Sequence, residues 1–111
     1  NNKEELIDFE SFQKLDLRVA KIIEAERIED SNKLVKLQVD LGDEKRQLVA
    51  GIAKHYEADD LLDKQIVIVA NLEPAEIFGV KSNGMILAAS TDEDLTLITP
   101  EKPINNGSKV K

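Results

Sequence analysis

Apolar and polar residues alternate most regularly between residues 35 and 41, in the stretch VKLQVDL. A period of two puts successive side chains on opposite faces of a strand, one towards a core and one towards water. The turn-prone LGDEK comes next, and RQLVAGI at residues 46–52 predicts a shorter returning strand. The two strands form a predicted hairpin whose open face carries Lys36, Gln38 and either Arg46 or Gln47.

The chain before this hairpin predicts a short helix and a long strand. Asp8 is a typical helix-capping residue, and Phe9 and Phe12 follow it at helical spacing. Residues 17–28 favour a strand, although their Ala, Glu and Lys content also permits a helix. The apolar residues expected on one face of that strand are Leu17, Val19, Ile23 and Ala25. Lys21 interrupts this face, so we expect the strand to be curved or bulged there.

The chain after the hairpin predicts a crossover and further strands. Residues 53–64 are polar with two leucine anchors and suit a short helical crossover. Residues 65–71, QIVIVAN, are β-branched and continuous, which predicts a strand buried on both faces. Residues 71–84 are expected to form a long functional loop. Residues 85–90 predict a fifth strand with its apolar part in the core. Residues 94–100 allow one more strand, and the remaining tail is expected to be irregular.

Five short strands with a helical crossover between the third and fourth are typical of an OB-fold. The predicted fold class is therefore all-β: a five-stranded Greek-key barrel with short helices and a C-terminal extension. We expect residues 1–8 to be the end of a linker and residues 9–111 to be one domain. OB-folds bind oligonucleotides through strands 2 and 3 and through the loops joining strands 1 to 2 and 4 to 5.

Charge modifies this picture in two ways. The chain has 111 residues and a net charge of −7, and an acidic balance argues against nucleic acid as a ligand. Residues 33–56 depart from that balance, with five basic and three acidic side chains. This locally basic segment covers the second and third predicted strands, which are the ones that bind ligand in OB-folds, although scattered surface charge could produce the same local excess.

Residue types also limit the chemistry. The chain has no cysteine and one histidine, which leaves no thiolate metal site, no disulfide and no supported Ser-His-Asp triad. We therefore expect no catalytic residue, no metal and no cofactor. No apolar run approaches the ~18 residues of a membrane span. The polar N-terminal residues do not resemble a signal peptide, so we expect a cytoplasmic protein with no membrane partner.

Four stretches resemble one known family. They are LDLRVAKIIEAERI, NKLVKLQVDLGDEKRQLVAGIAKHY, VIVANLEPAEIFGVKSNGMILAAS and INNGSKV, which together span about Phe9 to Val110. The pattern NLxPxxxxGxxSxGMxLAA is the most specific part. This combination is similar to the tRNA-binding domain appended to methionyl-tRNA synthetases, which also occurs in free-standing tRNA-binding proteins and a chaperone-like bacterial protein.

The resemblance implies a non-catalytic OB-fold module that binds tRNA by shape near its outer corner. It also implies a homodimer and a synthetase catalytic part, in cis or in trans, whose tRNA affinity the module raises. The sequence leaves two alternatives open: a dimerisation domain with weak RNA binding, or a peptide-binding chaperone-like relative. Glu73 and Glu76 stand where family members often carry Lys or Arg, so we expect modest affinity. Candidate dimer residues are Ile77, Phe78, Ile104 and the segment 95–111.

Candidate tRNA contacts follow from the OB-fold ligand face and the family motifs. They are Lys33, Lys36, Arg46, Gln47, Lys54, Asn71, Lys81, Ser82 and Asn83. Arg46 could clamp a phosphate or pair with Glu44 or Asp43. The lysines could bind phosphate or be merely solvated, and Asn71 could instead cap its own loop. Ser82 and Asn83 offer short polar groups beside Gly84, where the alternative is a tight turn entering a buried strand.

Overall fold

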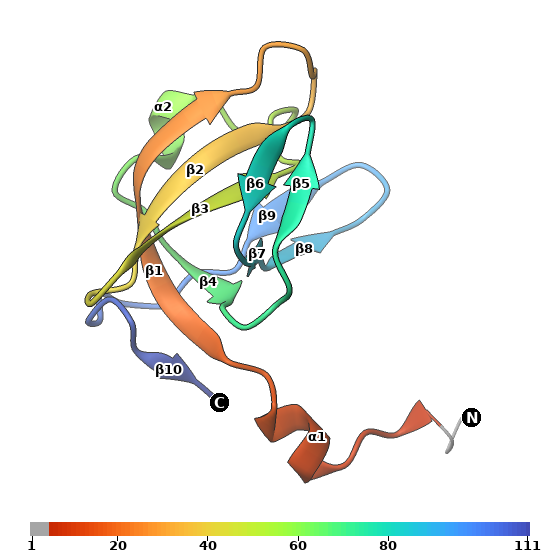
Figure 1. Ribbon diagram of the computed structural model, residues 1–111, viewed down its shortest axis with the longest axis vertical. Helices are drawn as coiled ribbons and strands as arrows, with labels where there is room; N and C mark the ends of the chain where they lie inside the picture. The colour runs from red at the N-terminus through yellow and green to blue at the C-terminus, as the bar shows by residue number, and fades with distance from the viewer. Residues whose placement is uncertain (1–4) are drawn as a thin grey trace.

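The computed structural model describes residues 5–111 as a small barrel with a helix outside it (Figure 1). The elements in chain order are α1 (Phe9–Gln13), β1 (Leu17–Arg27), β2 (Val35–Asp40), β3 (Lys45–Ala50), α2 (Ala58–Leu61), β4 (Gln65–Val69), β5 (Ala75–Ile77), β6 (Val80–Ser82), β7 (Met85–Ile86), β8 (Ala88–Ser90), β9 (Leu95–Leu97) and β10 (Lys109–Val110). In the described part of the chain, neither helix is long and apolar enough to cross a bilayer.

The main sheet runs in the order β3-β2-β1-β4-β7, with every neighbouring pair antiparallel. The chain entering β7 returns to β3, where the N–H of Asn83 donates to the carbonyl of Gln47 at 2.8 Å. This bond nearly closes the five strands into a barrel. The order, with α2 between β3 and β4, is that of an OB-fold, so the predicted fold class is confirmed.

The long first strand β1 serves two neighbours in turn. Residues 17–21 pair with β4 and residues 21–27 pair with β2, with a register shift between Ile22 and Glu24. The predicted irregularity therefore lies one or two residues beyond Lys21. The predicted inner face was wrong in part, because Ala20 and Ile22 are fully buried while Ile23 is half-buried. A bulge shifts the alternation of side chains between faces, so a single period of two cannot describe the whole strand.

The structure has a main hydrophobic core inside the barrel and a smaller apolar cluster on the outer face of β4. Ile22, Leu37, Leu48, Ile66 and Ile68 are among the fully buried side chains inside. A second small cluster of Leu17, Val67 and Val69 lies on the other face, covered by Phe12, Leu87 and Val110. Strand β4 is therefore buried on both faces, as its continuous apolar sequence predicts.

The second half of the chain corrects four expectations. The supposed loop at residues 71–84 contains the hairpin β5–β6, and the tail is not wholly irregular because β10 pairs with the start of β1. The predicted fifth strand is divided into β7 and β8, and β8 pairs with β9. Met85 is not in the core but is 46% exposed, since it pairs with Val69, whose side chain lies on the outer face of β4.

Helix α1 is capped as predicted but makes little contact with the barrel. The Asp8 carboxylate accepts a hydrogen bond from the N–H of Ser11 at 2.9 Å, and this bond holds the pKa of Asp8 below its ordinary value. No residue within Phe9–Gln13 is buried. Figure 1 shows α1 below the barrel, close to the end of the chain. The boundary between linker and domain at residues 8 and 9 stays a prediction.

Candidate nucleic-acid interface

A row of amides crosses the outer face of β2 and β3. The Nε2 of Gln38 donates to the Oε1 of Gln47 at 2.9 Å, and the Nε2 of Gln47 donates to the carbonyl of Lys81 in β6 at 2.8 Å. Lys36 shares this face through the alternation of β2 and pairs with Glu26 at 3.5 Å. Of the two residues considered for this face, Gln47 is the one that occupies it, because it lies directly opposite Gln38.

Arg46 points to the other side of β3, towards the end of the barrel. Its guanidinium pairs with Glu44, with Nε–Oε1 and Nη2–Oε2 distances of 3.1 and 3.3 Å. Its Nη1 donates to the carbonyl of Ala70 and lies 3.5 Å from the carbonyl of Asn83. Arg46 therefore joins β3, the end of β4 and the chain before β7, and its donors are used within the protein.

Ser82 is the one buried polar side chain among residues 5–111, at 5% exposure. Its hydroxyl oxygen accepts the N–H of Val49 at 3.0 Å and its hydrogen is directed to the carbonyl of Gly84 at 3.2 Å. The bond from Val49 attaches β6 to β3, and the bond to Gly84 holds the turn that follows β6. Asn83 contributes its main chain to the same junction through the bond to Gln47. Ser82 thus positions the strand that carries Lys81.

Gly84 is also buried, with φ of +133°. A Cβ at this position would lie 3.0 Å from the Cδ2 of Leu48 and 3.0 Å from the carbonyl oxygen of Val69. The absence of a side chain therefore allows the chain to pass between β3 and β4. This is the turn into a barrel strand that the sequence left open as an alternative.

Of the exposed lysines that carry no ion pair with any residue that the structure describes, three lie near this face. Lys33 lies in the β1–β2 loop, Lys54 follows β3, and Lys81 lies in β6. The carbonyl of Lys33 accepts the N–H of Ala53 at 3.0 Å, so the loops bearing Lys33 and Lys54 are held together. Lys81 is joined to the same surface by Gln47. These cations outline one side of the barrel, from the loop end to the middle of β3.

Asn71 lies apart from this surface and secures the entrance to β1. Its Nδ2 donates to the carbonyl of Lys14 at 2.6 Å and its Oδ1 accepts the N–H of Asp16 at 2.9 Å. It does not cap its own loop. The carboxylate of Asp16 also accepts a hydrogen bond from Arg18 at 3.1 Å, which, with the charges of Arg18 and Lys109, holds the pKa of Asp16 below its ordinary value.

The nine candidates therefore separate by position. Lys36, Gln47 and Lys81 share the outer face of the barrel, with the loop lysines Lys33 and Lys54 at one end. The side chains of Arg46, Asn71 and Ser82 are bonded within the protein, and Asn83 uses its main chain. The sequence did not indicate that Phe78 lies beside this face, because Phe-Gly is not one of the dipeptides that signal a two-residue hairpin turn. No group of three or more His, Cys, Asp or Glu side chains that could hold a metal occurs among residues 5–111.

Comparison with known proteins agrees with this geometry. Residues 17–109 match the family model described as "Putative tRNA binding domain". The chain is 56% identical to a methionine–tRNA ligase of Haloquadratum walsbyi over 97% of its own length, but it spans only 14% of that ligase.

Solved structures give the same result. A methionyl-tRNA-synthetase-related protein of Pyrococcus horikoshii has a TM-score of 0.91 and 36% identity, and the match covers 96% of this chain and 99% of that one. The chaperone CsaA of Bacillus anthracis has a TM-score of 0.88 and 32% identity, with 96% and 99% covered. On the extent of the family match and these likenesses, the chain belongs to the tRNA-binding domain family that includes the C-terminal region of methionyl-tRNA synthetases.

Proposed function

We propose that the chain binds tRNA on the face formed by β2, β3, β6 and the β1–β2 loop, and that it does so as a non-catalytic module of a methionine–tRNA ligase. The observation that carries this proposal is the grouping of three exposed lysines without an ion pair, Lys33, Lys54 and Lys81, around one amide-rich face of an otherwise acidic chain. Unpaired ammonium groups attract phosphate without first breaking an ion pair.

The contacts expected on this face explain binding by shape. Lysines act as point charges on phosphates and Gln38 and Gln47 offer amide groups, neither of which reads sequence when directed at the backbone. Recognition of folded RNA is mostly recognition of backbone shape, which suits the outer corner of tRNA. The net charge of −7 opposes binding, so the affinity is modest and depends steeply on salt. Such a module works where tRNA is charged with amino acid, in the cytoplasm.

Homodimerisation through α1 is the second part of the proposal. Phe9 is 71% exposed, and Leu6 and Ile7 before it are also exposed. Phe9 and Phe12 line an apolar pocket of about 350 Å³ with Leu15 and Val110. A second copy that covers this surface would remove apolar side chains from water. Two tRNA faces in one assembly then raise the overall affinity through effective concentration.

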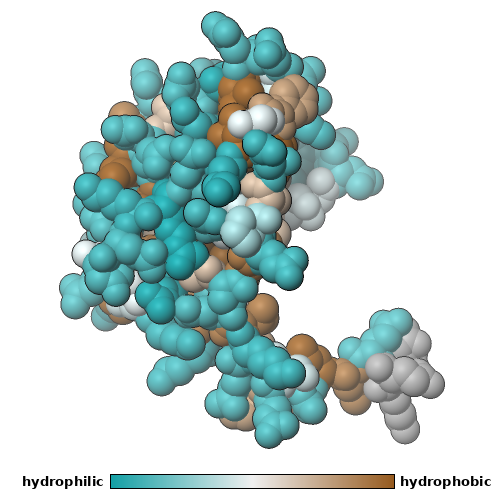
Figure 2. Space-filling model, in the orientation of Figure 1, coloured by the Kyte–Doolittle hydropathy of each residue, from teal (hydrophilic) through white to brown (hydrophobic). Residues whose placement is uncertain are grey.

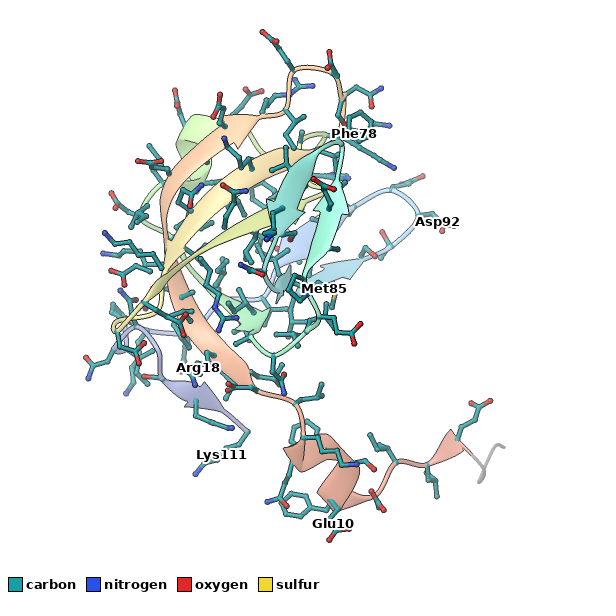
Figure 3. The ribbon with its side chains drawn as sticks, in the orientation of Figure 1. Glu10, Arg18, Phe78, Met85, Asp92 and Lys111 are labelled. Atoms are coloured by element: carbon teal, nitrogen blue, oxygen red, sulfur yellow. The ribbon has the colours of Figure 1, made fainter. Side chains whose placement is uncertain are left out.

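The dimer surface proposed here differs from the residues that the sequence favoured. Figure 3 shows Phe78 at the opposite end of the molecule from Glu10 in α1 and from Lys111. Of the earlier candidates, only the end of the chain lies beside α1, since Val110 lines the same pocket as Phe9. The proposal therefore rests on α1 and the last residues.

A paired set of charge reversals tests the tRNA face. Lys33→Glu with Lys81→Glu changes two exposed side chains that make no side-chain bond in the described structure. The control, Lys64→Glu with Lys102→Glu, makes the same change in net charge at a separate pocket. We expect the first variant to lose at least tenfold in tRNA affinity, with unchanged melting and unchanged oligomeric state. Equal losses in the two variants would show that overall charge, rather than this face, controls binding.

The likeness to the chaperone CsaA supports one alternative, the binding of unfolded polypeptide. The exposed apolar side chains around α1 would serve such a ligand as well as a second copy. A competition experiment separates the two functions: an unfolded polypeptide that displaces tRNA would place both ligands on one face, and protection of an aggregating protein without tRNA binding would favour the chaperone function.

A further inference from the structure

The tip of the β5–β6 hairpin has an unusual residue for its backbone. Ile77 pairs with Val80, so Phe78 and Gly79 form a two-residue loop, and their φ angles are 54° and 75°. Positive φ at both central positions is the signature of a type I′ turn, in which Asn-Gly is strongly preferred. A bulky aromatic residue is rare at positive φ. The turn geometry alone therefore does not account for a phenylalanine at this position.

Packing does not account for it either, because the side chain of Phe78 is 60% exposed. Figure 2 shows apolar side chains gathered at the upper end of the molecule, on a face otherwise dominated by polar ones, and Figure 3 places Phe78 at that end. Of the four aromatic residues in the chain, Phe9 lies on α1 and Phe12 packs on the cluster around Val67. Tyr56 packs against the core and its hydroxyl accepts the N–H of Leu97 at 3.1 Å. Phe78 is thus the aromatic ring available beside the proposed RNA face.

The surroundings of Phe78 form an open pocket of about 580 Å³ with the β1–β2 loop. Arg27, Asn32 and Lys33 line it, together with Glu29 and Asp30. Two basic and two acidic side chains leave this pocket balanced in charge, which does not suit a phosphate. A flat, uncharged ring with hydrogen-bonding edges suits it better, because the ring can stack while carboxylate and amide groups contact its edge.

The loop opposite Phe78 is held in place by its own bonds. The hydroxyl oxygen of Ser31 accepts the N–H of Lys33 at 3.1 Å and that of Leu34 at 3.2 Å. The Nη2 of Arg27 donates to the carbonyl of Ser31 at 3.4 Å. A braced loop on one side and a tight hairpin on the other make a preorganised slot. Lys33 belongs both to this pocket and to the proposed phosphate-binding set, so a base in the pocket would lie next to a bound backbone.

We infer that Phe78 stacks on an unpaired nucleobase of the bound RNA, in the pocket between the β5–β6 tip and the β1–β2 loop. This inference rests on the proposed function and extends it, because it adds a contact to a base to recognition of the backbone. It requires a base outside a helical stack, as occurs in the loops of folded RNA. A fully paired duplex offers no such base.

Two substitutions at one position test the inference. Phe78→Asn removes the ring and installs the residue that a type I′ turn prefers, so the fold is kept or stabilised. Phe78→Tyr keeps a ring of the same size. We expect Phe78→Asn to lose about tenfold in tRNA affinity, in the range typical for one stacked base. Phe78→Tyr should bind within about twofold of the unchanged protein. Because phenylalanine is uncharged, the slope of log affinity against log salt should stay the same for both.

A fully paired RNA duplex of similar length serves as the second ligand, and the two proteins should bind it equally. The inference is overturned if Phe78→Asn binds tRNA as tightly as the unchanged protein, or loses affinity for duplex and tRNA alike. Conversion of a dimer to a monomer by Phe78→Asn would also overturn it, because Phe78 would then be a protein contact. If the unchanged protein binds neither RNA, the proposed function itself fails. If Lys33→Glu with Lys81→Glu weakens binding and Phe78→Asn does not, only the stacking inference fails.

Discussion

Replacement of Ser82 by alanine separates a structural role from a binding role at the most distinctive motif of the chain. The hydroxyl of Ser82 accepts the N–H of Val49 and donates to the carbonyl of Gly84, and the serine is buried where the end of β6 meets β3. Alanine removes both bonds while adding no bulk. The N–H of Val49 then lacks its acceptor in a position from which the rest of the junction excludes water.

The expected loss of unfolding free energy follows from the unpaired N–H of Val49. A buried donor left without a partner destabilises a fold by about 1–3 kcal/mol. Domains of this size have a total stability of roughly 5–15 kcal/mol. A loss of about 1–3 kcal/mol lowers the melting temperature by about 4–24 °C, since each kcal/mol corresponds to roughly 4–8 °C in small domains. Because the serine hydroxyl does not face the proposed RNA surface, the tRNA affinity of the folded protein should change by less than about twofold.

Urea unfolding gives the free energy, and a titration with tRNA gives the affinity. Ser90→Ala is the matched control, because Ser90 is an exposed serine in the short strand β8 and should change stability by less than about 0.5 kcal/mol. Equal stability of Ser82→Ala and Ser90→Ala would refute the structural role. Unchanged stability with a tenfold loss of tRNA affinity would restore Ser82 as a direct contact.

Three further predictions concern other parts of the fold. Gly84→Ala should lower the free energy of unfolding in urea by roughly 2–4 kcal/mol, because the added Cβ would crowd Leu48 and Val69 at a positive φ. Gly79→Ala should lower it by only about 1 kcal/mol, because no atom lies within 4 Å of the added Cβ. Equal losses in the two variants would contradict this reasoning. The pKa of Asp16 is lowered in the folded state, so the ionised carboxylate stabilises the fold at neutral pH and this stabilisation is lost as the pH falls below about 4. The difference in unfolding free energy between the unchanged protein and Asp16→Asn should therefore shrink at low pH. A constant difference would be evidence against the Arg18 contact. Phe9→Asp should give a monomer in analytical ultracentrifugation without loss of fold, since Phe9 is exposed in a single copy; a surviving dimer would exclude α1 as the interface.

The barrel could be predicted from the sequence because its central strands have simple hydrophobic patterns. Residues 35–41 alternate cleanly, and the strand at residues 65–69 is continuous because both of its faces are covered. The errors fall where a local rule is broken. The inner face of β1 changes at a bulge near Ile23, and the β5–β6 hairpin escaped notice because its turn uses Phe-Gly in place of Asn-Gly.

The sequence could predict which residue types form the candidate site, but it could not predict which of those residues contact other parts of the protein. The lysines at positions 33, 54 and 81 are exposed, as expected of phosphate-binding groups. Arg46, Ser82 and Asn71 have the same polar character, but their partners Ala70, Val49 and Lys14 are 24, 33 and 57 residues away. Only the closed barrel brings these pairs together, so no spacing in the sequence could distinguish a residue that binds a ligand from one that supports the fold.

Titration with unfractionated tRNA and with a single-stranded RNA of the same length, at a series of salt concentrations, would show whether this domain binds folded RNA. We expect tighter binding of tRNA, because a braced protein surface matches a folded backbone. We also expect a slope of log affinity against log salt of about −2 to −3, because Lys33, Lys54 and Lys81 would each neutralise one phosphate. Equal affinity for the two RNAs, or no binding even at low salt, would contradict the account and leave dimerisation as the role of this domain.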